Sequence, residues 1–124
     1  ANDGVKVQTT NVWNYTNEYE IPRIVFINRM DADRANFESV FEDIESNFKG
    51  IRFIPLFYPI GKEAGFKGIV DLLSRKALLF SEDASGKFEM GEVPEDIAGP
   101  VDTFREKMIE SLVEADDALM EKYL

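Results

Sequence analysis

An unbroken apolar run, IVFI at residues 24–27, most constrains the fold that this chain can adopt. It lies between Pro22, which ends any helix that precedes it, and the polar residue Asn28. A short continuous apolar run with such boundaries is typical of a strand buried on both faces, as in parallel sheets. We therefore expect residues 23–27 to form a buried strand of an α/β sheet.

Helices are predicted on both sides of this strand. Before it, Thr9 or Thr10 is placed to cap a helix that runs to about residue 19. After it, residues 33–48 carry an apolar face at helical spacing, and Gly50 follows as the expected helix stop. The residues of that face are Phe37, Phe41, Ile44 and Phe48. Helix, strand and helix in this order predict a partial doubly wound α/β sheet.

After Gly50 the pattern changes to that of a small α+β unit with an antiparallel sheet and C-terminal helices. A hairpin is predicted across residues 81–87, and a final helical region over residues 101–123. Asp116 and Asp117 are placed to break that region and to cap a second helix. The predicted strands are residues 51–58 with Pro59 at their end, a short piece at 69–73, residues 76–80 and residues 88–93. We draw a domain boundary here, with residues 1–50 before it and residues 51–124 after it.

Composition restricts the chemistry that this chain can carry out. It has no Cys and no His, which removes thiolate nucleophiles, Ser-His-Asp arrangements and cysteine-based zinc sites. Its formal charge of −10 repels a phosphate backbone, so we expect no direct binding to nucleic acid. No apolar run approaches the ~20 residues of a membrane helix, so we expect no membrane partner. We predict neither catalytic residues nor a metal site.

Asn28 and Asp31 follow the predicted strand, at the position where ligands bind in open α/β sheets. A carboxylate can accept two parallel hydrogen bonds from N1–H and N2–H of guanine, and adenine has no matching pair of donors. The amide of Asn28 can donate to the base, and the stem of Arg29 can lie along its face. The same residue types are also ordinary turn formers after a strand, so the pattern leaves guanine recognition and a plain turn open.

The final helical region carries carboxylates and apolar groups on opposite faces. Glu106, Glu110 and Glu114 repeat every four residues, and an apolar stripe repeats at similar spacing two residues earlier. Like charges at this spacing repel by a few tenths of a kcal/mol per pair, roughly. The acidic face is therefore either a solvated surface or a docking surface for a basic partner. The apolar stripe begins with Phe104, Met108 and Leu112.

The glycine-rich stretch GKEAGFKG, residues 61–68, is interpreted as a structural turn. Its glycines and lysines do not follow the order of a phosphate-binding loop. Gly65-Phe66-Lys67-Gly68 fits the loop with which KH domains clamp RNA, but the acidic chain argues against that function.

Several segments together resemble bacterial translation elongation factor G, a translational GTPase family. They cover essentially the whole chain in the family's order: DGVKVQT, IPRIVFINRMD, ADRANF, YPIGKEAGFKGIVDLLSRKALLF and DDALMEKYL. The resemblance implies that Asn28 and Asp31 belong to the guanine-recognition motif, usually Asn-Lys-Met-Asp. Arg29 replaces the usual lysine, and its stem can still cover the base although its head differs in shape and hydration.

The resemblance also implies a central fragment of such a protein. Residues 1–50 would be part of the GTP-binding domain, and residues 51–124 the α+β subdomain inserted into it. The phosphate-binding loop and the magnesium-binding switch segments of the family precede this region, so we expect no GTP hydrolysis and no tight binding of GTP or GDP by this chain alone. The chain starts at Ala1 without an initiator methionine, which also favours a fragment or a processed chain.

The partners that the resemblance implies belong to the cytoplasmic translation machinery. The intact protein would couple GTP hydrolysis to translocation on the ribosome. Its inserted subdomain would contact the C-terminal domain of the ribosomal stalk protein through Glu106, Glu110 and Glu114. Two alternatives stay open: an independent acidic module that docks the stalk protein, and a tetracycline-resistance ribosomal protection protein.

Overall fold

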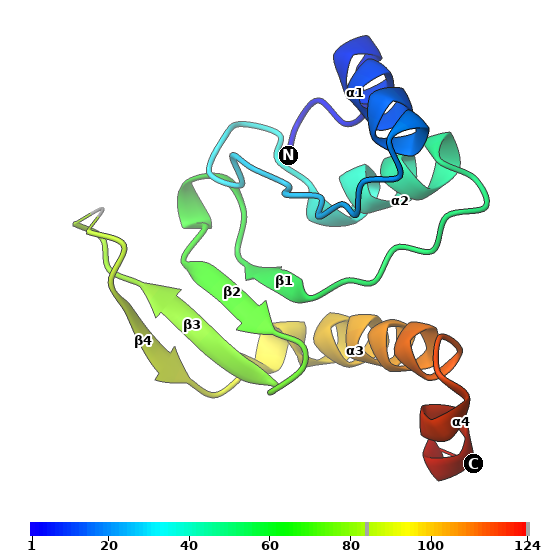
Figure 1. The fold of residues 1–124 in the computed structure, drawn as a ribbon. Helices are drawn as coiled ribbons and strands as arrows, with labels where there is room; N and C mark the ends of the chain where they lie inside the picture. The colour runs from blue at the N-terminus through cyan, green and yellow to red at the C-terminus, as the bar shows by residue number, and fades with distance from the viewer. Residues whose placement is uncertain (84, 124) are drawn as a thin grey trace.

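The computed structural model of the protein describes residues 1–83 and 85–123. Its strands form one antiparallel sheet in which each strand pairs with the next one along the chain, and the long helix that follows the sheet packs against it (Figure 1). The elements are α1 (Val7–Glu18), α2 (Phe37–Asn47), β1 (Phe57–Ile60), β2 (Gly68–Asp71), β3 (Lys76–Phe80), β4 (Phe88–Gly91), α3 (Ala98–Val113) and α4 (Asp117–Tyr123), with 3₁₀ turns at Glu63–Gly65 and Glu95–Ile97. This confirms the predicted fold class, an α/β chain with a small α+β subdomain.

The main core lies between the sheet and α3. Alternate residues of β1 and β2 point toward the helix, as expected for strands with one face on a core. Val70, Leu72 and Val101 have no exposed surface, and Met108 is only 1% exposed. The full set of buried residues in this cluster is Tyr58, Ile60, Val70, Leu72, Ala77, Val101 and Met108.

The predicted hairpin is confirmed by the pairing of Phe80 with Phe88 across the turn. The strand predicted at residues 76–80 is β3, with the same bounds. β2 begins one residue earlier and ends two residues earlier than predicted, and β4 ends at Gly91. β2 and β4 end earlier than predicted because their hydrogen-bonded pairing with β3 stops at Asp71 and Gly91.

The prediction of a strand over residues 51–58 was wrong in its bounds. β1 covers only Phe57–Ile60, and Pro59 lies inside it, paired with Ile69. Proline has no N–H to give to a ladder, and β1 tolerates it because it is the edge strand of the sheet. Residues 51–56 connect α2 to this edge without strand pairing.

The buried strand predicted at residues 23–27 is absent from the structure, which is a correction to the first half of the fold. These residues form an extended, irregular segment, in which the side chains of Ile24 and Phe26 are 89% and 82% exposed. A strand requires a hydrogen-bonded neighbour, and no strand of the described residues pairs with this segment. Arg23 instead ties the segment to α1 through a hydrogen bond to the Thr16 hydroxyl at 3.0 Å.

The first two helices are present, but their starts differ from the predictions. α1 begins at Val7, before Thr9 and Thr10, and the Thr9 hydroxyl accepts the backbone N–H of Lys6 at 3.3 Å. α2 begins at Phe37 rather than residue 33, because the Asn36 side chain caps it by accepting the Ser39 N–H at 3.0 Å.

The apolar face of α2 is confirmed, and so is its stop. Phe41, Ile44 and Phe48 are buried, and Phe37 is half-buried. Gly50 has a φ of +80°, the left-handed conformation expected after a helix.

The final helical region is divided as predicted. α3 ends at Val113, and the Asp116 carboxylate then accepts the backbone N–H of Ala118 at 2.8 Å, as a helix cap does. α3 starts at Ala98, three residues before the predicted start.

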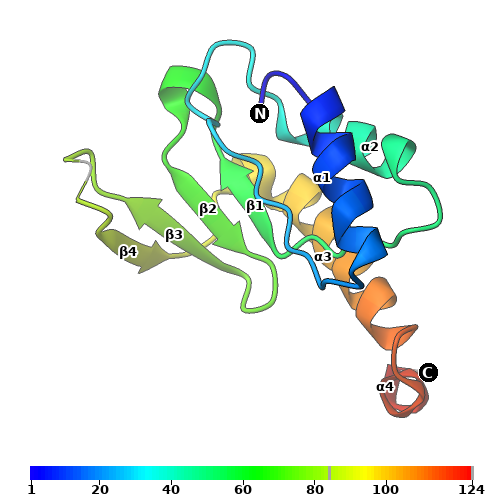
Figure 2. The same ribbon diagram turned by 45° about the horizontal axis from the view of Figure 1, so that its top comes forward.

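An aromatic cluster joins α2, β1 and α3. The ring of Phe104 lies 5.5 Å from those of Phe37 and Phe41 and 5.2 Å from that of Tyr58, between ring centroids. Elements from both sides of Gly50 therefore pack together, and the division into two domains there stays a prediction. Figure 2 shows α1 beside α2, at the end of the molecule far from β4. Within the described ranges, no helix has the length and the apolar character to cross a membrane.

Candidate functional site

The predicted base-binding residues lie together on one exposed turn. Asn28, Arg29 and Asp31 are exposed, whereas Met30 between them is buried, at 7% exposure. The side-chain oxygen of Asn28 accepts the backbone N–H of Arg29 at 2.7 Å. Arg29 has a φ of +59°, a left-handed conformation that L residues rarely adopt. The turn thus presents three polar side chains to solvent and anchors itself through Met30.

Short-range backbone bonds continue this turn to the start of α2. The N–H of Ala32 donates to the Arg29 carbonyl at 3.2 Å, and that of Ala35 donates to the Ala32 carbonyl at 3.1 Å. Ala35 is only 1% exposed, and Arg34 before it has a φ of +63°. Residues 28–35, here called the Asn-Asp turn, therefore have a defined shape without belonging to a helix or strand.

A distant glutamate holds the Asn-Asp turn from outside. The backbone N–H of Glu63 donates to the Met30 carbonyl at 2.8 Å, and the Glu63 carboxylate accepts the Arg34 N–H at 2.7 Å. In Figure 1 the 3₁₀ turn that contains Glu63 lies directly beside this part of the chain. The sequence patterns do not predict the contact of Glu63 with this turn, because Glu63 and Arg34 are 29 positions apart. The only sequence signal near Glu63 is the glycine-rich loop that contains it.

The Asn-Asp turn has the groups that recognition of a planar base requires. A carboxylate accepts two hydrogen bonds, an amide donates, and an arginine stem offers an apolar surface. However, the turn follows an exposed extended segment, so the expected position at the carboxyl end of a buried strand is not observed.

The predicted partner-binding residues are also exposed. Glu106 and Glu110 lie on α3, and Glu114 follows its last residue. Glu114 forms an ion pair with Arg52, a residue of the segment between α2 and β1. No sequence pattern predicts this ion pair, because the fold brings together two residues that are far apart along the chain. The acidic surface on α3 therefore consists of Glu106 and Glu110, with Glu114 partly neutralised.

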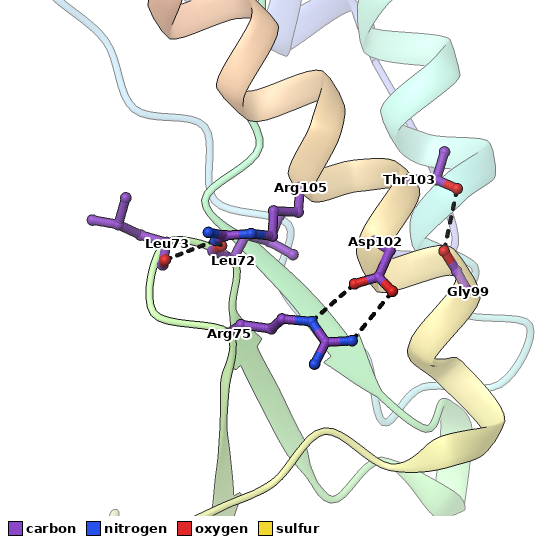
Figure 3. A network of polar contacts seen from close by, with 7 residues as sticks. All are labelled: Leu72, Leu73, Arg75, Gly99, Asp102, Thr103 and Arg105. Carbon is purple, nitrogen blue, oxygen red and sulfur yellow. Dashed lines mark hydrogen bonds and ion pairs between the residues drawn. The ribbon is translucent and has the colours of Figure 1, made fainter. Parts of the chain in front are cut away.

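Two arginines fasten the β2–β3 turn to α3 (Figure 3). Arg105 donates to the carbonyls of Leu72 and Leu73, the latter at 2.7 Å. Arg75 binds Asp102 with both ends of its guanidinium, at 2.9 and 3.2 Å. The hydrogen bond from Arg75 lowers the pKa of Asp102 below its ordinary value. These contacts fix the orientation of the helix that carries the acidic surface.

A buried tyrosine connects β1 to α2. The Tyr58 hydroxyl donates to the Glu38 carboxylate at 2.6 Å. Burial raises the pKa of Tyr58 far above its ordinary value, and so do the hydrogen bond and the charge of Glu38. Tyr58 is therefore a protonated structural donor at any physiological pH.

Comparisons with known proteins agree over most of the chain. The family model described as the elongation factor Tu GTP-binding domain matches residues 1–121. A crystal structure of a protein from Thermus thermophilus matches with a TM-score of 0.84 and 27% sequence identity. The match covers 98% of this chain and 17% of that chain. This chain therefore corresponds to a small part of the length of that protein.

Proposed function

The chain belongs to the family of the elongation factor Tu GTP-binding domain, and we propose that it is a central part of an elongation factor G-like translational GTPase. Membership of this family implies guanine-nucleotide binding and a function in translation. The proposal adds that the intact protein couples GTP hydrolysis to translocation on the ribosome, in the cytoplasm. The small share of the Thermus thermophilus chain that is covered supports a larger parent protein.

The observation that carries the proposal is the exposed Asn-Asp turn in a chain of this family. Asp31 would accept hydrogen bonds from N1–H and N2–H of guanine, and the amide of Asn28 would donate to the base. The Arg29 stem would cover one face of the ring. Discrimination arises because a wrong base leaves the carboxylate without its partners, which costs a few kcal/mol, roughly.

The proposal limits this chain to base recognition. We assign none of its described residues to the phosphates or to magnesium, whose positioning is the main requirement of phosphoryl transfer. We therefore expect the chain alone to hydrolyse no GTP. Phosphate release above a buffer blank that Asp31→Ala abolishes would contradict this limit.

A carboxylate-to-amide exchange tests the base assignment. In the full-length protein, Asp31→Asn should weaken GDP binding at least about tenfold, because the amide presents donors to the guanine donors. Xanthosine diphosphate should bind better than to the wild type, because its 2-oxo group accepts from that amide. The affinities are measured by titration calorimetry.

Asp33→Asn is the matched control, since Asp33 is an exposed carboxylate two residues away. It should leave both affinities unchanged. Unchanged GDP affinity in Asp31→Asn would refute the assignment of Asp31.

A second candidate function, docking of the ribosomal stalk protein, is favoured by the exposure of Glu106 and Glu110 on α3. We propose that these residues and Glu114 attract a basic surface on the C-terminal domain of the stalk protein. This function could belong to the inserted subdomain of the GTPase or to an independent module.

An NMR titration of the labelled chain with that domain tests the docking. Amide shifts should concentrate near Glu106 and Glu110 and weaken as salt rises, because salt screens exposed charges. Glu106→Gln should reduce them, and Glu89→Gln, an exposed glutamate on β4, should not. Well-dispersed spectra without shifts would contradict the docking proposal and show that the acidic surface only keeps this face of α3 hydrated.

A further inference from the structure

Three non-glycine residues with left-handed backbones meet where the Asn-Asp turn touches the glycine-rich loop. The φ angles are +59° at Arg29, +63° at Arg34 and +53° at Glu63. Such conformations are unfavourable for L residues, and they persist only where the surroundings hold them. Their concentration at one contact indicates that the contact imposes a particular shape on the turn.

In addition to the backbone bonds within the turn, Glu63 makes two bonds that hold it from outside, one on each side of Asp31. Its N–H binds the carbonyl of Met30, the residue before Asp31. Its carboxylate binds the N–H of Arg34, three residues after Asp31. A single residue of another segment therefore contacts the backbone on both sides of Asp31.

The loop that carries Glu63 is tightly closed and is bonded to β1. Gly61 has a φ of +76°, and a Cβ there would lie 2.0 Å from the Gly65 carbonyl oxygen, so the loop closes too tightly for any side chain. The Lys67 N–H donates to the carbonyl of Ile60 at 2.8 Å and ties the end of the loop to β1. Glu63 therefore connects the Asn-Asp turn to the end of β1 through hydrogen bonds.

We infer that Glu63 is a positioning residue for guanine recognition, an inference that rests on the proposed function. Glu63 touches no base in this scheme. Two parallel hydrogen bonds from a base require the Asp31 carboxylate to keep one orientation, and a turn free at one end would let it sample several. Glu63 would therefore increase the preference for guanine over bases that engage only one oxygen of Asp31.

The test compares two substitutions of Glu63 in the full-length protein. Glu63→Asn tolerates the left-handed backbone but is too short to reach the Arg34 N–H, whereas Glu63→Gln keeps an acceptor oxygen at the same reach. Affinities are measured for GDP and for inosine diphosphate, which lacks the 2-amino group. Lys62→Ala, an exposed neighbour in the same loop, is the control.

Glu63→Asn should lower GDP affinity about fivefold, the effect of one lost hydrogen bond, and inosine diphosphate affinity less. The ratio of the two affinities should therefore fall, and Glu63→Gln should restore it. An equal loss for both nucleotides, or no loss, would overturn the inference and leave Glu63 with a purely structural function. If Asp31→Asn also left the ratio unchanged, the base assignment itself would fail, which separates the two results.

Discussion

Single side chains hold the β2–β3 turn against α3. Arg75 and Asp102 form a two-bonded ion pair on the surface, and Arg105 binds two carbonyls of the turn. Paired planar groups of this kind restrict geometry more than a single-point contact does. At the scale of residues, the Arg75 contact depends on one carboxylate, that of Asp102, whose charge can be removed by acid.

The Arg75–Asp102 pair makes stability depend on pH. Because the pKa of Asp102 is lowered in the folded state, the pair stabilises the fold above the unfolded pKa of about 3.9. That stability is lost as the pH falls through the lower folded pKa. Asp102→Asn should therefore lower the free energy of unfolding at neutral pH and have little effect once the pH lies well below the folded pKa of Asp102.

Urea unfolding of both proteins over a pH series measures this difference. Asp96→Asn, an exposed carboxylate in the 3₁₀ turn before α3, serves as the control. A difference that persists at the lowest pH would mean that Asp102 acts through its shape and not through its charge.

Local sequence patterns identify some site residues and miss others for a physical reason. Asn28, Arg29 and Asp31 are neighbours in sequence, so their grouping follows from the chain itself. Glu63 and Arg52 act on residues about 30 and 60 positions away, and such contacts exist only after the fold brings the segments together. The spacing of residues along the sequence therefore does not predict these contacts.

At the scale of elements, close approach between β2 and β3 excludes a side chain at Gly68. A Cβ at this position would lie 2.1 Å from the Leu78 carbonyl oxygen, a backbone atom that cannot move without disturbing the pairing. Gly68→Ala should therefore destabilise the protein by about 1–3 kcal/mol, as overpacking does.

Gly99→Ala is the matched substitution, because Gly99 lies in the first turn of α3 with open space around its Cα. It should be neutral or stabilising by up to about 1 kcal/mol, since alanine favours the helix. Thermal unfolding of both variants measures the difference. Equal effects would show that the sheet relaxes to admit a methyl group.

Helices and strands also differ in how well their own residues predict them. The apolar face of α2 predicts its helix, because i,i+4 contacts form within the element. β3 and the hairpin follow from alternation and turn residues close together in sequence. The apolar run at residues 24–27 predicted a strand wrongly, because a strand is stable only beside another strand and the described chain places none there. β1 is shorter than the predicted strand for the same reason, because residues 51–56 pair with no strand of the described chain.

At the scale of the whole molecule, the exposed apolar segment at residues 24–27 predicts self-association of the chain on its own. Ile24 and Phe26 project almost fully into solvent from an extended backbone without strand partners. Such a segment can pair with another chain. Phe26→Ser should therefore reduce association at high protein concentration and change stability by less than about 0.5 kcal/mol.

Sedimentation equilibrium over a concentration series measures this effect. Tyr15→Ser is the control, because Tyr15 is a large exposed side chain on α1, at 63% exposure, outside the segment. An oligomer that survives Phe26→Ser would place the contact elsewhere on the molecule.

The stack of Trp13 on Phe48 provides an optical reporter at a known place. Trp13 is the single tryptophan of the chain, its ring lies 4.2 Å from that of Phe48, and the Arg23 guanidinium lies 4.0 Å above it. Its fluorescence therefore responds to three segments at once: α1, the end of α2 and the stretch that leads to Asn28. Loosening of that stretch would change the emission while the sheet stays intact, so movement next to the Asn-Asp turn can be followed without any added label.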